Sequence, residues 1–174
     1  MQNQLKQILF DEATLQQRVR GLAAEVESAY QGQPLTAIIL SNGALFFAAD
    51  LLRRINLPLH LDMIGVSSYS GTESRGQVDF RYPPKLPLHG HHVLIVDDIL
   101  DTGRTLEGVI AFCRDAGALS VRCCVLLDKP SRRIAQIQAD FIGFSIDDLF
   151  VVGYGLDLNE KFRNLPCIGI PDLG

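Results

Sequence analysis

The stretch that most constrains the fold of this chain is residues 93–106, VLIVDDILDTGRTL. It begins with four branched apolar residues, and a run without polar alternation is typical of a strand covered on both faces, as in a parallel sheet. Two carboxylates, Asp97 and Asp98, follow where we expect this strand to end. A polar turn at residues 101–105 then leads into the helical spacing of Leu106, Val109, Ile110 and Cys113. The stretch therefore predicts a buried strand, an acidic turn and a helix, in this order.

The turn and the two carboxylates suit different parts of one ligand. A loop that enters a helix presents unpaired N–H groups and the positive end of the helix dipole, and both favour phosphate. Thr102 and Thr105 can add hydroxyl donors, and Gly103 lets the backbone approach closely. Asp97 and Asp98 suit vicinal hydroxyls, or Mg²⁺ held partly by substrate oxygens. A phosphorylated ribose offers a phosphate, vicinal hydroxyls and oxygens that can share a bound Mg²⁺. The alternative interpretation is a solvated acidic turn before an ordinary helix cap.

Composition excludes several classes of protein. With 174 residues the chain is long enough for one domain with a substantial core. The net charge of −4 argues against a general attraction to nucleic acid or to anionic membranes. No segment approaches the roughly 20 apolar residues that span a bilayer, and the N-terminus lacks a secretory pattern. The cysteines lie in apolar surroundings without CxxC spacing, as Cys113, Cys123, Cys124 and Cys167. We therefore expect a cytoplasmic protein with reduced, buried thiols.

The segments before the central stretch predict a helix and two strands. A capping-box pattern at residues 14–17 precedes one apolar helical face, formed by Leu15, Val19, Leu22, Ala23, Val26 and Tyr30. Residues 35–40 predict a strand, which Ser41-Asn42-Gly43 and a second helical pattern follow. A strand, a glycine turn and a helix are again the geometry of an anion site, although most such turns bind nothing. Residues 60–67 predict a further strand.

The region between this strand and the central stretch is polar. Residues 68–76 fit either an exposed hairpin or a mobile lid over a ligand, and Val78 and Phe80 alternate with polar residues as in an antiparallel strand. An HxHH cluster precedes the central strand, formed by His89, His91 and His92. Because the sequence offers it no matching carboxylate or cysteine, we interpret it as the solvated start of a strand instead of a metal site.

After the central stretch, the pattern predicts strands at residues 121–127, 141–144 and 150–152, with Gly117 capping the preceding helix. Lys129 directly follows the first of these strands. In an open α/β sheet the carboxyl ends of the strands are where ligands bind, although a solvated lysine is the commoner case. The last part of the chain, residues 153–164, is polar and marked by glycines.

Four motifs together resemble the type I phosphoribosyltransferases, and among them the hypoxanthine-guanine phosphoribosyltransferases. They are SSYSGTESRG, VLIVDDILDTGRTL, LLDK and FVVGYGLDLNEKFRNLP, and the resemblance covers the chain from about Leu15 to Ile170. The last motif discriminates best, because the ribose-phosphate signature is shared by the wider superfamily. The resemblance implies an α/β fold with a twisted, mainly parallel sheet flanked by helices. It also implies one domain over residues 1–174, with a core at about 33–145 and a small hood from the N-terminal segment and about 146–174.

The resemblance implies site residues for 5-phosphoribosyl-1-pyrophosphate (PRPP). Asp97 and Asp98 would engage the ribose hydroxyls and Mg²⁺. Asp101 would face N7 of the purine as the acid/base group, and Arg163 would meet the pyrophosphate. The 5′-phosphate would be held by Asp101, Thr102, Gly103, Arg104 and Thr105, and the pyrophosphate loop would contain Asn42 and Gly43. Many members carry a lysine where this chain has Asn42, but the backbone N–H groups of that loop, often beside a cis peptide, remain available.

The resemblance also implies how a purine base is bound. Lys129 would donate to O6, Phe150 would stack on the ring and Val151 would contact it through its backbone. Asp157 would lie at the base site and help hold a second Mg²⁺. Ser68 and Tyr69 would belong to a lid that closes over the site.

The activity implied is purine salvage, in which the 5-phosphoribosyl group moves from PRPP to N9 of hypoxanthine or guanine and gives IMP or GMP plus pyrophosphate. A xanthine-preferring enzyme is an alternative, and so is a regulator that senses ribose phosphates and binds nucleic acid. The acidic balance and the complete set of motif residues favour the enzyme, acting on small molecules without nucleic acid or membrane partners. The resemblance leads us to expect a homodimer or a homotetramer.

Overall fold

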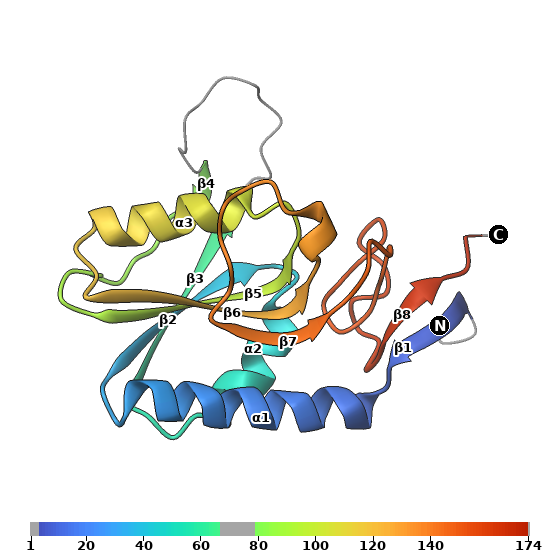
Figure 1. Ribbon diagram of the computed structural model, residues 1–174, viewed down its shortest axis with the longest axis horizontal. Helices are drawn as coiled ribbons and strands as arrows, with labels where there is room; N and C mark the ends of the chain where they lie inside the picture. The colour runs from blue at the N-terminus through green and yellow to red at the C-terminus, as the bar shows by residue number, and fades with distance from the viewer. Residues whose placement is uncertain (1–3, 67–78, 174) are drawn as a thin grey trace.

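The fold is built on one sheet, seen in a computed structural model that describes residues 4–66 and 79–173. Within these residues, six strands lie in the order β4-β3-β2-β5-β6-β7 (Figure 1). All are parallel except β4, which runs antiparallel to β3 at one edge. Their bounds are β2 Leu35–Ser41, β3 Leu59–Val66, β4 Phe80–Tyr82, β5 His92–Leu100, β6 Ser120–Asp128 and β7 Phe141–Ser145.

Helices cover both faces of this sheet. Figure 1 shows α1 (Glu12–Tyr30) and α2 (Leu45–Leu52) on one face and α3 (Arg104–Asp115) on the other. Side chains alternate across β5, so that Leu94 and Val96 join the core under α1 and α2 while Val93 and Ile95 join the core under α3. This two-sided burial explains the unbroken apolar run in the sequence and confirms the predicted mainly parallel α/β fold.

The two ends of the chain meet in a second, smaller sheet. Strand β1 (Leu5–Phe10) pairs antiparallel with β8 (Ile168–Pro171), beside the carboxyl end of β7 (Figure 1). We refer to this pair as the terminal sheet. The sequence patterns did not predict either strand, but the pairing brings the terminal segments together as the resemblance implies.

The structure corrects three local predictions. The central strand does not end before Asp97, because β5 pairs with β6 as far as Leu100 and Asp128. The first helix begins at Glu12 and not after Thr14, since Asp11 is the N-cap and its carboxylate accepts from the Thr14 N–H at 2.8 Å. Residues 150–152 form no strand, and only Val152 makes an isolated bridge, to Gly169. The buried face predicted for α1 is confirmed at all its positions.

The order of the strands places a crevice at the centre of the sheet. The chain passes from β2 outward to β3 and then returns to β5 on the opposite side of β2. In open α/β sheets, ligands bind at such a reversal, outside the carboxyl ends of the strands. None of the helices in the described part of the chain is long and apolar enough to cross a membrane.

Candidate active site

A cavity of about 270 Å³ opens at this reversal. Its walls come from the ends of β2, β3 and β5, from the turn after β5 and from the start of α3. It brings together most of the residues predicted for the ribose and its 5′-phosphate, namely Asp97, Asp98, Asp101, Thr102, Gly103 and Thr105. The predicted grouping of these residues therefore agrees with their positions in the fold.

Asp97 and Asp98 form the acidic wall of the cavity. The Asp98 N–H donates to Asp97 Oδ1 at 2.9 Å, and the Ile99 N–H donates to Asp98 Oδ1 at 2.9 Å. Burial raises the pKa of both carboxyls, and the adjacent charge of Asp98 raises the pKa of Asp97 further. At Asp98, hydrogen bonds and the charge of Arg163 oppose the rise in pKa. Two crowded carboxylates of this kind are stabilised by a bound cation.

The turn after β5 is fixed from behind by the segment that follows β6. The Arg133 guanidinium donates to the carbonyls of Asp101 at 3.0 Å and Leu100 at 3.2 Å, and it pairs with Asp128. The Thr102 carbonyl accepts from the N–H groups of residues 134 and 135, at 2.9 and 3.0 Å. Because N–H and C=O point in opposite directions in a trans peptide, drawing these carbonyls backward turns the following N–H groups toward the cavity. Such a row of N–H groups suits a phosphate.

The loop predicted for pyrophosphate lies directly against the acidic wall. A Cβ atom added to Gly43 would come within 1.8 Å of Asp98 Oδ2. A Cβ atom on Gly155 would come within 2.0 Å of the Gly43 carbonyl. The peptide bond between Ser41 and Asn42 is cis, and Asn42 is exposed. The two glycines thus let three chain segments converge where pyrophosphate is expected.

The predicted base-binding residues lie at the end of β6 and in the last part of the chain. Lys129 is buried, and its Nζ lies 3.8 Å from Asp148 Oδ1. Phe150 is 53% exposed, although Val151 beside it is buried. An exposed aromatic ring can stack on a flat base, and a buried lysine can donate a hydrogen bond to it.

Arg163 and Asp157 pair with each other. Arg163 Nη2 lies 2.9 Å from Asp157 Oδ1, and Arg163 Nη1 donates to the Gly155 carbonyl at 2.8 Å. Asp157 Oδ2 accepts from the Glu160 N–H at 2.8 Å. Protein donors therefore occupy both oxygens of Asp157, and a Mg²⁺ ion there would replace at least one of these contacts.

The turn that carries Gly155 is anchored by Tyr154. The Tyr154 hydroxyl donates to Asp50 Oδ2 at 2.6 Å, and Gln16 donates to the same oxygen at 2.6 Å. Arg53 and Arg54 pair with the other oxygen of Asp50. Burial alone would raise the pKa of Asp50, but the hydrogen bonds from Tyr154, Gln16 and Arg53 hold this pKa below its usual value. Asp50 thus ties the site's turn to α1 and α2.

We expect Asp50→Asn to lower the free energy of unfolding by about 1–2 kcal/mol at pH 7, as is typical of lost hydrogen bonds to a charged group. Because the folded pKa of Asp50 is depressed, its contribution is present above the unfolded pKa and is lost as the pH falls below about 4. Urea unfolding at pH 7 and pH 3 should therefore give a clear difference between variant and wild type at pH 7 and a smaller one at pH 3. Equal differences at both pH values would contradict this role of the carboxylate.

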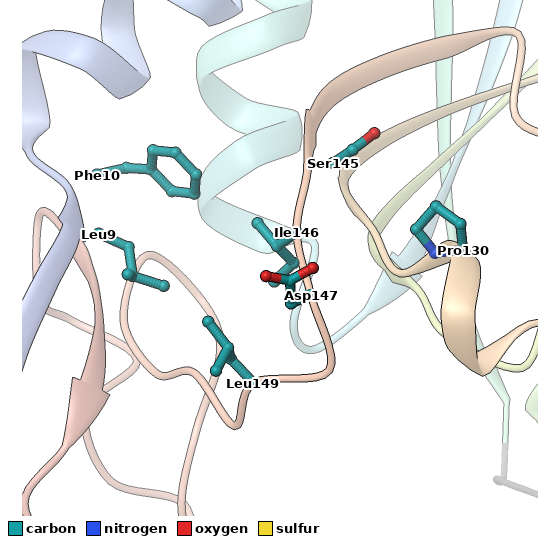
Figure 2. A pocket seen from close by; sticks show the side chains of 7 residues that line it. All are labelled: Leu9, Phe10, Pro130, Ser145, Ile146, Asp147 and Leu149. Carbon is teal, nitrogen blue, oxygen red and sulfur yellow. The ribbon is translucent and has the colours of Figure 1, made fainter.

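A second cavity, of about 390 Å³, lies between the terminal sheet and the segment after β7. Figure 2 shows Leu9 and Phe10 on one side of it and Ile146, Asp147 and Leu149 opposite them. It is separate from the cavity at the acidic wall and shares no lining residue with it.

Some predictions cannot be compared with the structure, and some residues were missed. Ser68 and Tyr69 lie outside the described residues. His91 and His92 bond the hydroxyls of Thr36 and Ser120, and the described residues contain no cluster of three or more potential metal ligands. Sequence reasoning missed Arg132, Arg133, Asp148 and Asp50 as supports of the site. Only the adjacent arginines just after Lys129 gave any signal, and the pattern does not say which acids they pair with.

The chain is similar to known proteins over most of its length. Residues 6–159 match the family described as "Phosphoribosyl transferase domain". The chain is 43% identical over 171 residues to the hypoxanthine-guanine phosphoribosyltransferase of Bacillus subtilis, covering 98% of this chain and 95% of that protein.

Solved structures agree as well. A hypoxanthine phosphoribosyltransferase from Staphylococcus aureus superposes with a TM-score of 0.93 at 40% identity, over 98% of this chain and 95% of that one. A hypoxanthine-guanine phosphoribosyltransferase from Bacillus anthracis gives a TM-score of 0.90 at 37% identity, over 96% and 97% of the two chains.

Proposed function

Since the chain belongs to the phosphoribosyl transferase family, we propose that it is a purine salvage enzyme that acts on hypoxanthine and guanine. It transfers the 5-phosphoribosyl group of PRPP to N9 of the base and forms IMP or GMP plus pyrophosphate. The observation that carries this function is the cavity at the centre of the sheet, where an acidic wall faces a phosphate-binding turn. Near-full-length relatives with the same named activity support it.

The residues around the cavity suit the charges that develop in the reaction. Positive charge grows on the ribose as its bond to pyrophosphate breaks, while negative charge grows on the leaving group. Arg163 stabilises that negative charge, and the backbone of the Asn42-Gly43 loop binds the same group. Asp97 and Asp98 hold the ribose hydroxyls close to the breaking bond. Asp101 accepts the proton that the purine loses at N7 as N9 attacks.

Mg²⁺ fits the acidic wall. The two carboxylates supply the hard oxygen ligands that Mg²⁺ prefers, and such an ion usually takes its remaining ligands from substrate and water. Asp97 and Asp98 would hold one ion, and Asp157 would help hold a second. The metal, when bound, neutralises charge on the departing pyrophosphate.

Lys129 supplies the base selectivity. Its ammonium group has three donors and no acceptor, so it favours the 6-oxo group of hypoxanthine or guanine over the 6-amino group of adenine. Phe150 stacks on the ring and Val151 contacts it through the backbone.

Four free, buried cysteines fit a reducing cytoplasm.

Product analysis tests the proposed function. Incubation of the purified protein with PRPP, Mg²⁺ and hypoxanthine should give IMP and pyrophosphate in equal amounts, quantified by chromatography and a pyrophosphate assay. Chelation of Mg²⁺ with EDTA should abolish both products, and added Mg²⁺ should restore them. PRPP consumption without IMP would contradict transfer to a base.

We also propose that the chain assembles as a homodimer or a homotetramer. In the parallel register, Leu61 and Met63 lie opposite Ala37 and Ile39 and so face the same side of the sheet as α2. They are 58% and 38% exposed. Leu45 and Phe46 at the start of α2 are also exposed. Large apolar side chains that stay exposed on the face covered by α2 are typical of an association surface.

We expect Met63→Glu to shift the protein toward the monomer, because a carboxylate at the centre of an apolar interface is desolvated without a partner. Sedimentation velocity of wild type and variant at the same concentration measures this shift. Leu119→Glu is a matched control, since Leu119 is 65% exposed and lies just before β6, three strands away from β3. If both variants sediment like wild type, the association surface lies elsewhere.

A further inference from the structure

A chain of ion pairs connects the two residues assigned to the purine. Asp101 Oδ1 lies 3.1 Å from Arg132 Nε. Arg132 Nη1 lies 3.7 Å from Asp148 Oδ2, and the other oxygen of Asp148 lies 3.8 Å from Lys129 Nζ. The acidic and basic side chains alternate, so every neighbour in the chain is of opposite charge. We refer to Asp101, Arg132, Asp148 and Lys129 as the ionic bridge.

The local fold produces this alignment. Lys129 caps the 3₁₀ turn Pro130–Arg132, and the Arg132 N–H donates to the Lys129 carbonyl at 3.1 Å. Both cations project toward Asp148, since each forms an ion pair with one of its oxygens. Asp148, in the segment after β7, is therefore within reach of both cations at once.

The two ends of the ionic bridge match the edge of a 6-oxopurine. On that edge O6 accepts a hydrogen bond and lies next to N7, where the proton is lost. Lys129 is a donor for the first position, and the Asp101 carboxylate is an acceptor for the second. The spacing between donor and acceptor therefore decides whether one base can satisfy both.

Building on the proposed function, we propose that Arg132 and Asp148 are positioning residues that set this spacing and so determine selectivity for 6-oxopurines. Asp148 orients Lys129, whose side chain is only 9% exposed, and supplies its counter-charge. Arg132 fixes the Asp101 carboxylate, which is 39% exposed. Asp128, which is also near Lys129 in sequence, is committed to Arg133.

Asp147 provides a matched control beside Asp148. It is exposed like Asp148, but it lines the second cavity together with Leu9 and Phe10 (Figure 2). Among the described residues it forms no ion pair with Lys129 or Arg132. Asp147→Asn and Asp148→Asn thus make the same chemical change at adjacent positions, and only the second one breaks the ionic bridge.

Steady-state kinetics with hypoxanthine, adenine and PRPP tests the proposal. We expect Asp148→Asn to raise KM for hypoxanthine about two- to fivefold and to lower the preference for hypoxanthine over adenine by a similar factor, as for the loss of one partly exposed ion pair. KM for PRPP should change less than about twofold, because the ion pairs of Asp148 are with Lys129 and Arg132 and not with the phosphate turn. Asp147→Asn should match wild type in all three constants.

Arg132 gives an independent test. Arg132→Met should lower kcat about tenfold through a poorly oriented Asp101, and Arg132→Lys, which keeps the charge, should recover part of it. In kcat/KM for hypoxanthine, the loss in the double variant Arg132→Met/Asp148→Asn should be smaller than the product of the two single losses. The reason is that each single change already interrupts the ionic bridge.

The outcomes separate the ionic bridge from the proposed function. If wild type turns over no 6-oxopurine, the proposed function is wrong. The positioning role of the ionic bridge is contradicted, while the function stands, by either of two results with an active wild type. In the first, Asp148→Asn keeps the base selectivity of Asp147→Asn. In the second, the losses of kcat/KM in Arg132→Met and Asp148→Asn multiply independently in the double variant.

Discussion

Asp101→Asn is expected to lower kcat by about 10²–10⁴-fold, the usual contribution of a positioned acid/base group. Asparagine keeps the size of the side chain, and its amide oxygen can still accept from Arg132, which lies 3.1 Å from the carboxylate in the native protein. What it removes is the ability to accept the proton from N7. KM for PRPP should therefore change by less than about threefold, because the carbonyl contacts that hold the phosphate turn are unaffected.

Pre-steady-state and steady-state rates with saturating PRPP measure this effect, and the PRPP affinity from calorimetry serves as its control. Equal losses in turnover and in PRPP affinity would show that Asp101 acts in binding the sugar phosphate and would exclude it as the base. The exposure of this side chain at the cavity makes a merely structural effect on folding small.

Gly43→Ala is expected to lower kcat/KM for PRPP by about 10²-fold, the cost of displacing a reacting group by roughly 1 Å. The added methyl would lie 1.8 Å from Asp98 Oδ2, so either the acidic wall or the pyrophosphate loop must move. The loop has little room to move, because Gly155 also packs closely against the Gly43 carbonyl. The affinities of the variant for Mg²⁺ and for pyrophosphate should both be lower than those of wild type.

Gly21→Ala is the matched control for this variant. Gly21 lies within α1, and a methyl there would meet only the end of the flexible Arg18 side chain, at 3.2 Å. We expect its activity to equal that of wild type and its stability to rise or stay the same, since alanine is favoured over glycine within helices. A Gly43→Ala protein with normal kcat/KM for PRPP would show that the acidic wall and this loop are not coupled in catalysis.

The sequence predicted the centre of the fold well because burial on two faces leaves a strong pattern. Residues 93–96 are apolar without interruption, and in the structure their side chains pack alternately into the hydrophobic cores on the two faces of the sheet. The apolar spacing of α1 likewise corresponds to its buried face. Where such periodicity is present, hydrophobic burial dominates the local choice of structure.

The ends of elements were predicted less well, because polar contacts set them. Strand β5 continues through Asp97 and Asp98 since its backbone keeps pairing with β6, whatever the side chains prefer. The sequence patterns missed strands β1 and β8, because these strands pair with each other from opposite ends of the sequence. Local propensity carries little information on such distant pairing.

Within the candidate site, motifs identified the residues that would contact the ligand but not those that support them. Arg133, Arg132 and Asp148 act through partners that are apart in sequence, at residues 100–101, 101 and 129 respectively. From one sequence, a charged residue that supports a site cannot be distinguished from one that is only solvated at the surface. Its role appears only when the fold brings its partner near.

The most direct test of the proposed function is a spectrophotometric assay of the wild-type protein with PRPP and Mg²⁺, in which hypoxanthine, guanine, xanthine and adenine are offered separately. We predict rapid turnover of hypoxanthine and guanine and at least about 10²-fold lower kcat/KM for adenine, since adenine offers a donor where buried Lys129 needs an acceptor. Turnover of adenine at a comparable rate, or no turnover of any base despite tight PRPP binding, would contradict the function proposed for this chain.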